Sequence, residues 1–312
     1  MRERKRKKEI LKLYQDGILS QRVREAYSLL EKCQVCPREC GVNRLKGEQG
    51  FCRSGLLPVV SSCNTHHGEE PPISGQRGSG TIFLANCNLR CVFCQNYPIS
   101  QLGVGNEVTV EELSKMMLKL QKSGCHNINF VTPTHFAPQI LKAVELATVE
   151  GLNIPLLWNT NGYDSVEMLR LLDGVISIYL PDAKYMDPQM AQKYSNALSN
   201  YPEINLAAIK EMWRQTGSLV IDTEGIAQKG VIVRHLVLPE GIAGTKQVLK
   251  MLAQEISPNV YISLMSQYFP ANKASSYSEI NRKISRQEYD DALECLDAEG
   301  LCDGWIQPYQ EG

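Results

Sequence analysis

The chain has 312 residues, 43% of them hydrophobic, and a formal net charge of −1 at pH 7. This length and composition are typical of a soluble globular protein that buries one large core and has room for a small extension. The near-zero net charge argues against nucleic acid as a partner, and the lack of a run of about 18 apolar residues argues against a membrane span.

The N-terminal segment MRERKRKKEILKLY (1–14) is strongly basic but lacks the apolar centre of a signal peptide. We interpret it as the solvated start of a helix, with an arm that binds nucleic acid or a membrane as the alternative. The chain also contains 11 cysteines. Without an export signal, so many cysteines indicate a reducing compartment, where clustered thiols serve metal or redox chemistry rather than disulfides. We therefore expect a cytoplasmic protein.

A small cysteine-rich head follows the N-terminal helical segment and extends to about residue 75. Its stretch CQVCPRECGVNRLKGEQGFC has the spacing Cys-x2-Cys-x3-Cys-x11-Cys, formed by Cys33, Cys36, Cys40 and Cys52. Four thiols at this spacing predict a closed metal site, which structural zinc and an auxiliary [4Fe–4S] cluster fit equally well. We expect one domain over residues 1–75, with the helix and this head, and a second over residues 76–312.

From about residue 80, short aliphatic and β-branched runs alternate with amphipathic helical patterns. The six expected strands are TIFLA (81–85), NINFV (127–131), PLLWNT (155–160), VISIYL (175–180), VIVRHLVL (231–238) and YISLMS (261–266). Helical patterns lie between them, for example at residues 110–124 and at 138–151, the second ending at a glycine. Six βα units in series predict an α/β fold with a parallel sheet and helices outside it.

Polar residues stand at the end of every expected strand. In chain order they are Asn86 and Cys87; Thr132, Thr134 and His135; Asn159, Thr160 and Asn161; Asp182 and Lys184; Arg234 and His235; and Gln267 and Tyr268. In parallel βα barrels the site gathers at the C-terminal ends of the strands, so the agreement of six strands predicts a site there. Arg234 and His235 are adjacent on one strand and should point to opposite faces. Either His135 or His235 could instead be a hydrogen-bonded structural histidine.

Three cysteines lie within the eight residues CNLRCVFC (87–94), at the spacing Cys87-x3-Cys91-x2-Cys94. Zinc sites and ordinary iron–sulfur sites usually close their coordination shell with a fourth protein ligand. On a [4Fe–4S] cluster, three thiolates would leave one iron open to a substrate or a cofactor. The incomplete set therefore predicts a catalytic metal centre.

The spacing of these three cysteines after the first strand, with Phe93 before the third cysteine, resembles the signature of the radical S-adenosylmethionine (SAM) enzymes. The stretches GSGTIFLANCNLRCVFCQN and HHGEEPPISG resemble the pyruvate formate-lyase activating enzyme-like branch, and within it a group with a Cys-rich head. The resemblance covers nearly the whole chain. It implies a partial (β/α)6 TIM-like barrel, a [4Fe–4S] cluster on the three cysteines, and SAM bound to the open iron through its amino and carboxylate groups.

The resemblance also implies a reaction. One-electron reduction of the cluster cleaves SAM to methionine and a 5′-deoxyadenosyl radical, which abstracts hydrogen from a substrate. A flavodoxin- or ferredoxin-type protein would supply the electron. The expected use is activation of a glycyl-radical enzyme or modification of another protein or peptide. The alternatives are a radical SAM enzyme that acts on a small metabolite and a non-catalytic iron–sulfur or zinc protein.

Two motifs of the relatives place SAM contacts at the second and third strands. Relatives carry a Gly-Gly-Glu type motif for the SAM amino group where this chain has VTPTH. The hydroxyls of Thr132 and Thr134, or the backbone at Pro133, are therefore expected to take that part. NTNGY resembles the Asp-Thr-Asn-Gly stretch of the activating enzymes, which implies that Asn159 and Asn161 line the ribose or the methionine.

Three further contacts follow from the later strands. LPDAKY resembles an Asp-x-Lys motif, which implies that Asp182 and Lys184 contact the methionine end of SAM. Arg234 lies where relatives place an arginine, and its fixed charge suits a carboxylate. An ion-pair network that closes the barrel is the alternative for these three residues. Gln267 and Tyr268 are expected near the adenine or the substrate, with packing at the rim as the alternative.

Overall fold

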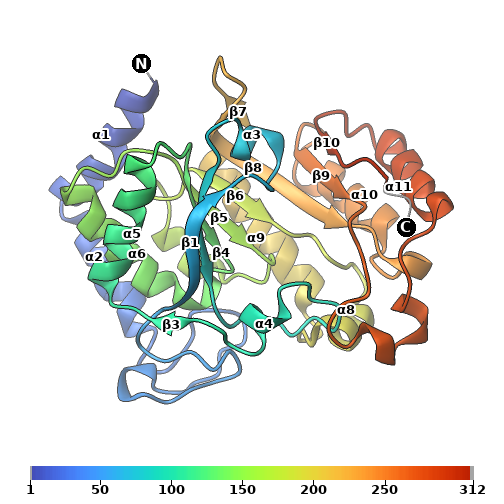
Figure 1. The fold of residues 1–312 in the computed structure, drawn as a ribbon, viewed down its shortest axis with the longest axis horizontal. Coiled ribbons are helices and arrows are strands. Elements are labelled where there is room, and N and C mark those ends of the chain that lie inside the picture. The colour runs from blue at the N-terminus through green and yellow to red at the C-terminus, as the bar shows by residue number, and fades with distance from the viewer. Residues whose placement is uncertain (1, 310–312) are drawn as a thin grey trace.

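A curved, mostly parallel sheet forms the centre of the computed structural model, which describes residues 2–309 (Figure 1). Its parallel strands, in sheet order, are β2 (Ser79–Leu84), β4 (Ile128–Val131), β5 (Leu156–Thr160), β6 (Ile178–Pro181), β8 (Ala227–Leu236) and β9 (Tyr261–Met265). Each coincides with one of the six expected strands. The predicted α/β fold with a parallel sheet is therefore confirmed.

Four further strands extend this sheet, and the sequence patterns did not predict them. They are β1 (Val59–His66), antiparallel to β2; β3 (Asn106–Glu107), antiparallel to β1; β7 (Val220–Ile221), antiparallel to β8; and β10 (Gly304–Ile306), parallel to β9. β1 lies within residues 1–75, the expected head domain. That part of the chain thus contributes a strand to the sheet of the barrel.

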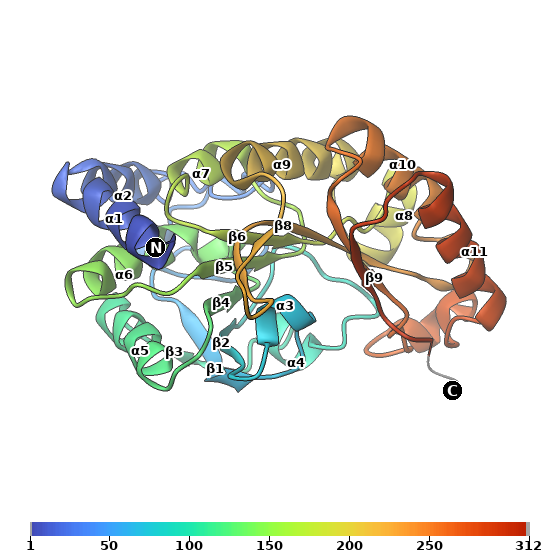
Figure 2. The same cartoon turned by 90° about the horizontal axis from the view of Figure 1, so that it is seen from above.

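Helices surround the outer face of the curved sheet, as Figure 2 shows from above. They are α1 (Arg2–Gln15), α2 (Ile18–Ser28), α5 (Val110–Lys122), α6 (Ala137–Val149), α7 (Val166–Leu171), α8 (Pro188–Ser195), α9 (Tyr201–Thr216), α10 (Thr245–Glu255) and α11 (Arg286–Ala298). α5 begins with a capping box between Thr109 and Glu112, which satisfies the first free backbone N–H groups of the helix. Within residues 2–309, no helix is both long enough and apolar enough to cross a membrane.

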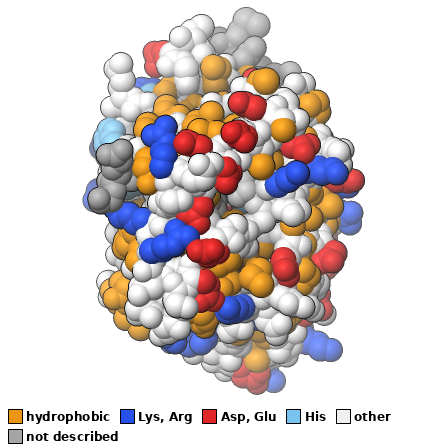
Figure 3. Space-filling view, turned by 90° about the vertical axis from the view of Figure 1, so that its right-hand side faces the viewer, with side chains coloured by type: hydrophobic (Ala, Val, Ile, Leu, Met, Phe, Trp, Pro, Cys, Tyr) orange, Lys and Arg blue, Asp and Glu red, His pale blue; other side chains and the backbone are white. Residues whose placement is uncertain are grey.

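Charges of both signs cover the surface near the C-terminus. Acidic and basic side chains are intermixed on the face that carries the C-terminal helices (Figure 3), as in the ion pairs of Arg282 with Glu240 and of Arg286 with Asp290. The basic N-terminal segment begins α1, but the side chains of residues 1–8 lie outside the described part of the structure.

A short helix closes the end of the barrel where the parallel strands begin. This helix, α3 (Pro71–Ser74), lies near β7 in Figure 1. Its Ile73 is fully buried in an apolar cluster with Leu157, Ile178, Leu180, Ala227 and Ile232. The C-terminal ends of the strands lie at the opposite end, beside α4 (Tyr97–Ser100) and α8 (Figure 1).

The segment 33–58, which we call the head loop, lies against the C-terminal ends of the strands. It contains a 3-10 turn at Arg44–Lys46; others lie at Thr134–Phe136, Pro239–Gly241, Ala274–Ser276 and Ser278–Ile280. Arg44 is 1% exposed and donates hydrogen bonds to the carbonyl oxygens of Gly55 and His135, at 2.7 Å each. One buried guanidinium, with several donors in fixed directions, therefore fastens the head loop to the loop after β4.

Candidate active site

The catalytic loop, residues 87–94, runs from the end of β2 toward α4 and carries all three closely spaced cysteines. It is preceded by Asn86, whose φ of 69° is one that asparagine adopts more readily than most residues. The N–H of Asn86 donates to the carbonyl oxygen of Ile99 at 3.0 Å, and the sulfur of Cys94 lies 3.2 Å from the hydroxyl of Ser100. The loop is thus held against α4 at both of its ends.

Burial, hydrogen bonds and neighbouring charges define the surroundings of the sulfur atoms in the catalytic loop. Cys87 Sγ accepts hydrogen bonds from the N–H of Leu89 and from the side-chain amide of Asn161, both at 3.3 Å. Burial, and then the neighbouring thiols of Cys91 and Cys94, raise the pKa of Cys87 to about 12. Burial also raises the pKa of Cys91, although the ammonium of Lys184 opposes the change. Thiols in such a place become thiolates when a cationic centre binds them, which is what an iron–sulfur cluster does.

The donor set fits a [4Fe–4S] cluster with three protein ligands. Within residues 2–309, no three His, Cys, Asp or Glu side chains are placed so that they could hold a single metal ion. A cluster has a different requirement, because each thiolate binds a different iron and the sulfurs need not meet at one point. Cys87, Cys91 and Cys94, with two N–H donors directed at one of the sulfurs, meet that requirement.

The loop after β5 lies against the catalytic loop. Asn161 donates through one amide nitrogen to Asn88 Oδ1 at 2.7 Å as well as to the Cys87 sulfur, and Asn88 in turn donates to the carbonyl oxygen of Tyr163 at 2.7 Å. At Gly162, φ is 74°, and a Cβ atom would lie 2.1 Å from the carbonyl oxygen of Asp182. The glycine of NTNGY therefore lets this loop pass directly over the end of β6.

The loop after β6 brings a positive charge to the cysteines. Lys184 Nζ lies 2.5 Å from Asp182 Oδ2, and both side chains are mostly buried. Burial alone would lower the pKa of Lys184, but the charges of Asp182 and of Cys91 raise it above its ordinary value. A protonated lysine thus lies next to Cys91, at the position expected for the methionine end of SAM.

Arg234, on β8, is held by carboxylates that sequence reasoning missed. Its Nε donates to Glu70 Oε1 at 2.6 Å, one terminal nitrogen contacts both Glu69 and Glu70, and the other lies 3.3 Å from Asn159 Oδ1. Burial would raise the pKa of Glu70, but its pairing with Arg234 lowers that pKa below the ordinary value. Arg234 thus takes part in an ion-pair network inside the barrel, which was the alternative to a contact with SAM. A SAM carboxylate would have to compete with Glu69 and Glu70 for the guanidinium of Arg234. Both glutamates belong to the stretch HHGEEPPISG, so the sequence did contain a signal for these two partners of Arg234.

Two histidines near the strand ends are structural. His235 points away from Arg234, as predicted, and its ring nitrogens lie 2.7 Å from the Ala183 carbonyl oxygen and 2.9 Å from the Thr245 hydroxyl. His135 lies 2.9 Å from the carbonyl oxygen of Ala85. Burial lowers the pKa of His235 to about 4 and that of His135 to about 3, so both are neutral at pH 7.

The two threonines after β4 have different surroundings. Thr134 is 2% exposed, and its hydroxyl donates to Asp164 at 2.8 Å, as do the side chains of Thr160 and Trp158 at 2.6 and 3.2 Å. This buried network is centred on Asp164, which was not predicted. The Thr134 hydroxyl, which was expected to contact SAM, donates its hydrogen bond to this network instead. Thr132 is partly exposed and has φ of 58°, a strained conformation for a β-branched residue. Such strain gathers at functional sites, so Thr132 remains the better candidate of the two.

The residues after β9 lie at the rim of the site. Gln267 is exposed, and its carbonyl oxygen accepts a hydrogen bond from Gln95, the residue after Cys94, at 3.0 Å. Tyr268 is 2% exposed; its hydroxyl donates to the Ile280 carbonyl oxygen at 2.6 Å and its ring meets Phe93 edge-on at 5.7 Å. For Tyr268, the packing alternative is therefore the one observed.

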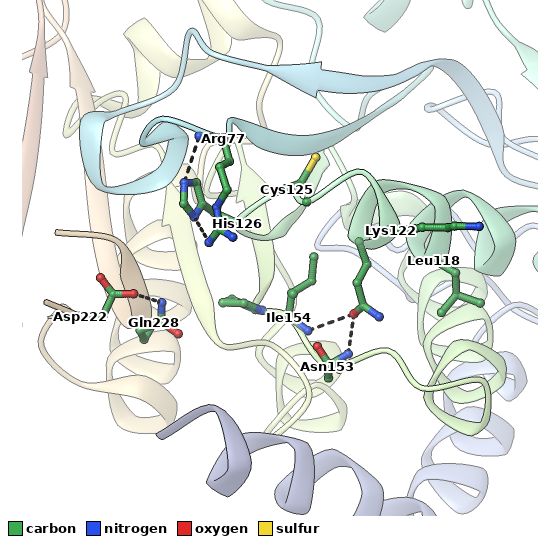
Figure 4. A pocket seen from close by; sticks show the side chains of 12 residues that line it. Arg77, Leu118, Lys122, Cys125, His126, Asn153, Ile154, Asp222 and Gln228 are labelled. Atoms are coloured by element: carbon green, nitrogen blue, oxygen red, sulfur yellow. Dashed lines mark hydrogen bonds between the residues drawn. The ribbon is translucent and has the colours of Figure 1, made fainter. Parts of the chain in front are cut away.

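A cavity of about 440 Å³ lies at the opposite end of the sheet, where the parallel strands begin (Figure 4). Its polar side chains are already paired with one another: Arg77 contacts both ring nitrogens of His126, and Asp222 accepts a hydrogen bond from Gln228 at 2.9 Å. The cysteines and the lysine lie at the other end. We therefore locate the active site at the C-terminal ends of the strands and not in this cavity.

Known proteins are similar to this chain in sequence and in fold. A sequence model of the radical SAM superfamily matches residues 81–212. Uncharacterized protein MJ0674 of Methanocaldococcus jannaschii is 31% identical over 301 residues, which are 93% of this chain and 82% of that protein. Among solved structures, HydG, a maturase of the [FeFe]-hydrogenase, has a TM-score of 0.51 at 14% identity, over 78% of this chain and 54% of HydG.

A second solved structure, Streptococcus suis SuiB bound to S-adenosylmethionine, has a TM-score of 0.48 at 10% identity, over 72% of this chain and 48% of SuiB. The chain thus spans about half the length of both solved proteins. The matching superfamily implies a [4Fe–4S] cluster and SAM, which the catalytic loop is suited to hold. By its sequence, its fold and its three loop cysteines, the chain belongs to the radical SAM superfamily.

Proposed function

We propose that the protein is an enzyme that cleaves SAM at the catalytic loop and uses the product to activate a glycyl-radical enzyme or to modify another protein or peptide. The observation that carries the first part is the set of three cysteines after β2, with Asn161 and Lys184 brought to it by two other strands. A [4Fe–4S] cluster bound there would supply the electron that converts SAM to methionine and a 5′-deoxyadenosyl radical.

In this proposal the residues of the chain bind, orient and shield. Cys87, Cys91 and Cys94 hold three irons, and the amide of Asn161 fixes the position of one sulfur. Lys184, held by Asp182, offers a positive charge to the carboxylate of SAM.

Further residues at the ends of the strands complete the proposed SAM site. Thr132 offers its backbone at the end of β4, while Thr134 supports the loop through Asp164. Asn159 and Arg234 form the polar floor of the site, and Gln267 lies at its rim.

A protein or peptide as the target is supported by apolar side chains around the catalytic loop. Leu102 and Val104, which follow α4, are 66% and 57% exposed, and Leu45, Leu56 and Leu57 of the head loop are each more than a third exposed. Exposed apolar side chains on segments next to a candidate site are typical of a docking surface. The pyruvate formate-lyase activating enzyme-like motifs in the sequence favour the same class of target. The proposal also includes a flavodoxin- or ferredoxin-type electron donor.

A small metabolite is the second candidate for the substrate. It is favoured by the polar interior of the barrel, where Glu69, Glu70 and Arg234 lie beneath the site and Asn129 Oδ1 is buried without a hydrogen-bond partner. A polar compound could use that oxygen. For the head, we propose a separate metal centre, zinc or an auxiliary [4Fe–4S] cluster, on Cys33, Cys36, Cys40 and Cys52.

SAM cleavage is tested by anaerobic reconstitution with iron and sulfide, reduction with dithionite, and measurement of 5′-deoxyadenosine. The wild type should form it, and the Cys91→Ala variant should not. Cys295→Ala, which removes a partly buried cysteine on α11, is the matched control and should behave as the wild type. Formation of equal amounts by Cys91→Ala would contradict the proposal.

The target is tested by adding pyruvate formate-lyase and recording the glycyl radical by electron paramagnetic resonance. The double variant Leu102→Asp/Val104→Asp should keep SAM cleavage without the target but lose most of the glycyl radical. SAM cleavage by the wild type with no glycyl radical would contradict this use and favour another substrate.

A further inference from the structure

We infer that the four head cysteines hold an iron–sulfur cluster of their own, because among the described residues no three His, Cys, Asp or Glu side chains are placed to hold a single metal ion. We also infer that Arg38 links this cluster to the catalytic loop so that the head tunes the catalytic cluster. The second part rests on the proposed catalytic cluster. The first part, a metal site on the head loop, stands without it.

The backbone of the head loop brings its four cysteines together. The N–H of Cys33 donates to the Val42 carbonyl oxygen at 2.9 Å, and the N–H of Gly41 donates back to the Cys33 carbonyl oxygen at 3.1 Å. These bonds pair the segment of the first cysteine with that of the third. The N–H of Phe51 lies 3.5 Å from the Cys40 sulfur, which brings in the segment of the fourth cysteine.

The head cysteines have the character of metal ligands. All four are free thiols, and Cys33, Cys36 and Cys52 are only 6 to 8% exposed. Four free thiols gathered on one loop without a disulfide suit a thiophilic metal centre, which binds them as thiolates.

Arg38 connects the head cysteines with the catalytic loop. It lies between Cys36 and Cys40 in the chain, and its Nε donates to the carbonyl oxygen of Asn88, next to Cys87, at 2.9 Å. Its guanidinium lies 3.5 Å above the ring of Phe51, next to Cys52.

A second arginine, Arg90, also connects the two loops. Arg90, between Cys87 and Cys91 in the chain, lies 4.6 Å from the centre of the same Phe51 ring and donates to the Phe51 carbonyl oxygen at 2.8 Å. Two arginines, one from each cysteine loop, thus contact one aromatic ring. Cation–π contacts and hydrogen bonds to backbone oxygens hold the two loops as one unit.

The charge of Arg38 has a consequence for reduction. A cluster gains one negative charge when it accepts an electron, and a nearby fixed positive charge stabilises that state. Since Arg38 contacts the backbone beside Cys87, its removal should make reduction of the catalytic cluster harder. A tenfold change in the reduction equilibrium of a one-electron couple corresponds to about 59 mV.

The metal site is tested in a variant that lacks the catalytic ligands, Cys87→Ala/Cys91→Ala/Cys94→Ala. After anaerobic reconstitution with iron and sulfide in one sample and with zinc in another, we expect about four irons and no zinc to remain per chain. Further replacement of Cys33 and Cys36 by Ala should remove that metal. If the triple variant binds neither metal above the level of the quintuple variant, the head site is excluded, whatever the outcome for SAM cleavage.

The link is tested by reductive titration of the intact protein without SAM, with the paramagnetic signal of the catalytic cluster as the readout. Arg38→Met should shift its midpoint to more negative potential, by roughly a tenfold loss in the reduction equilibrium, while Arg38→Lys, which keeps the charge, should retain most of the wild-type value. Equal potentials in Arg38→Met and the wild type would overturn the link. A shift of the same size in Arg38→Lys would overturn the assignment of the effect to charge.

Discussion

The two groups of cysteines differ in the parts of the molecule that surround them. The catalytic loop has three cysteines, and other strands bring it Asn161 and Lys184. The head loop has four cysteines, which its own backbone gathers. An incomplete set of thiols surrounded by side chains of the barrel leaves a place for SAM, whereas a complete set leaves none. If the proposed function is right, the number of thiols and the origin of their neighbours distinguish the reactive centre from the supporting one.

The largest effect should come from removing one of the three cysteines of the catalytic loop. Cys91→Ala removes one of three ligands, so we expect loss of all detectable SAM cleavage, measured as 5′-deoxyadenosine. Cys36→Ala removes one of the four head cysteines and should lower the rate without abolishing it. Equal losses in the two variants would show that the two groups do not differ in the way proposed.

The next largest effect concerns the buried charges under the site. Arg234→Met leaves Glu69 and Glu70 without their cation, and breaking a buried ion pair by removing one partner costs about 3–5 kcal/mol of unfolding free energy. Urea unfolding of the reconstituted protein measures this loss of unfolding free energy. Arg286→Met is the matched control, since its pair with Asp290 is exposed and such a pair contributes less than about 1 kcal/mol. A loss at Arg234 no larger than at Arg286 would refute the buried network.

A smaller effect should follow from the neighbours of Cys87. Asn161→Ala removes the amide that donates to its sulfur, and loss of such a supporting hydrogen bond typically reduces metal affinity or activity about 10-fold or more. We expect faster loss of iron during chelator challenge, read from the absorbance of the cluster. Asn64→Ala, at an exposed position of β1, should lose iron at the wild-type rate. If Asn161→Ala also does so, the amide does not support the ligand.

The smallest effect is a dependence on pH. The pKa of Glu70 is below its ordinary value of 4.5 in the folded protein, so its carboxylate stabilises the fold above that value. That contribution is lost as the pH falls through the lowered pKa, because the group must then bind a proton. Glu70→Gln should therefore flatten the decline of the melting temperature as the pH falls below 4.5. An acid decline as steep as in the wild type would contradict this role.

The parallel strands could be predicted because each is a short aliphatic run in a repeating βα pattern. β1 could not: Val59–His66 lies in a cysteine-rich, polar segment, and its pairing with β2 depends on the fold. Likewise, the cysteine spacing is local and could be recognised, whereas the partners of Arg234 lie 164 and 165 residues away in the chain. Local patterns thus revealed the candidate metal ligands. The role of a charged residue such as Arg234 depends instead on partners that lie far away in the chain.

The hydroxyl of Thr134 illustrates the same limit. Its position after β4 was predicted, but its partner Asp164 belongs to the loop after β5. Only the packed structure shows that this hydroxyl is turned away from the site. Arg38 is a similar case, because nothing in its local sequence indicates the contact with Asn88.

The central claim, that the catalytic loop holds a cluster with an open iron, is tested most directly by the paramagnetic spectrum of the reduced protein with and without SAM. The Cys33→Ala/Cys36→Ala variant would remove any signal of the head and leave that of the catalytic loop. The account predicts that SAM changes the spectrum of this variant and of the wild type, and that neither change occurs in Cys91→Ala. A fully loaded, reduced cluster whose spectrum SAM leaves unchanged would contradict it.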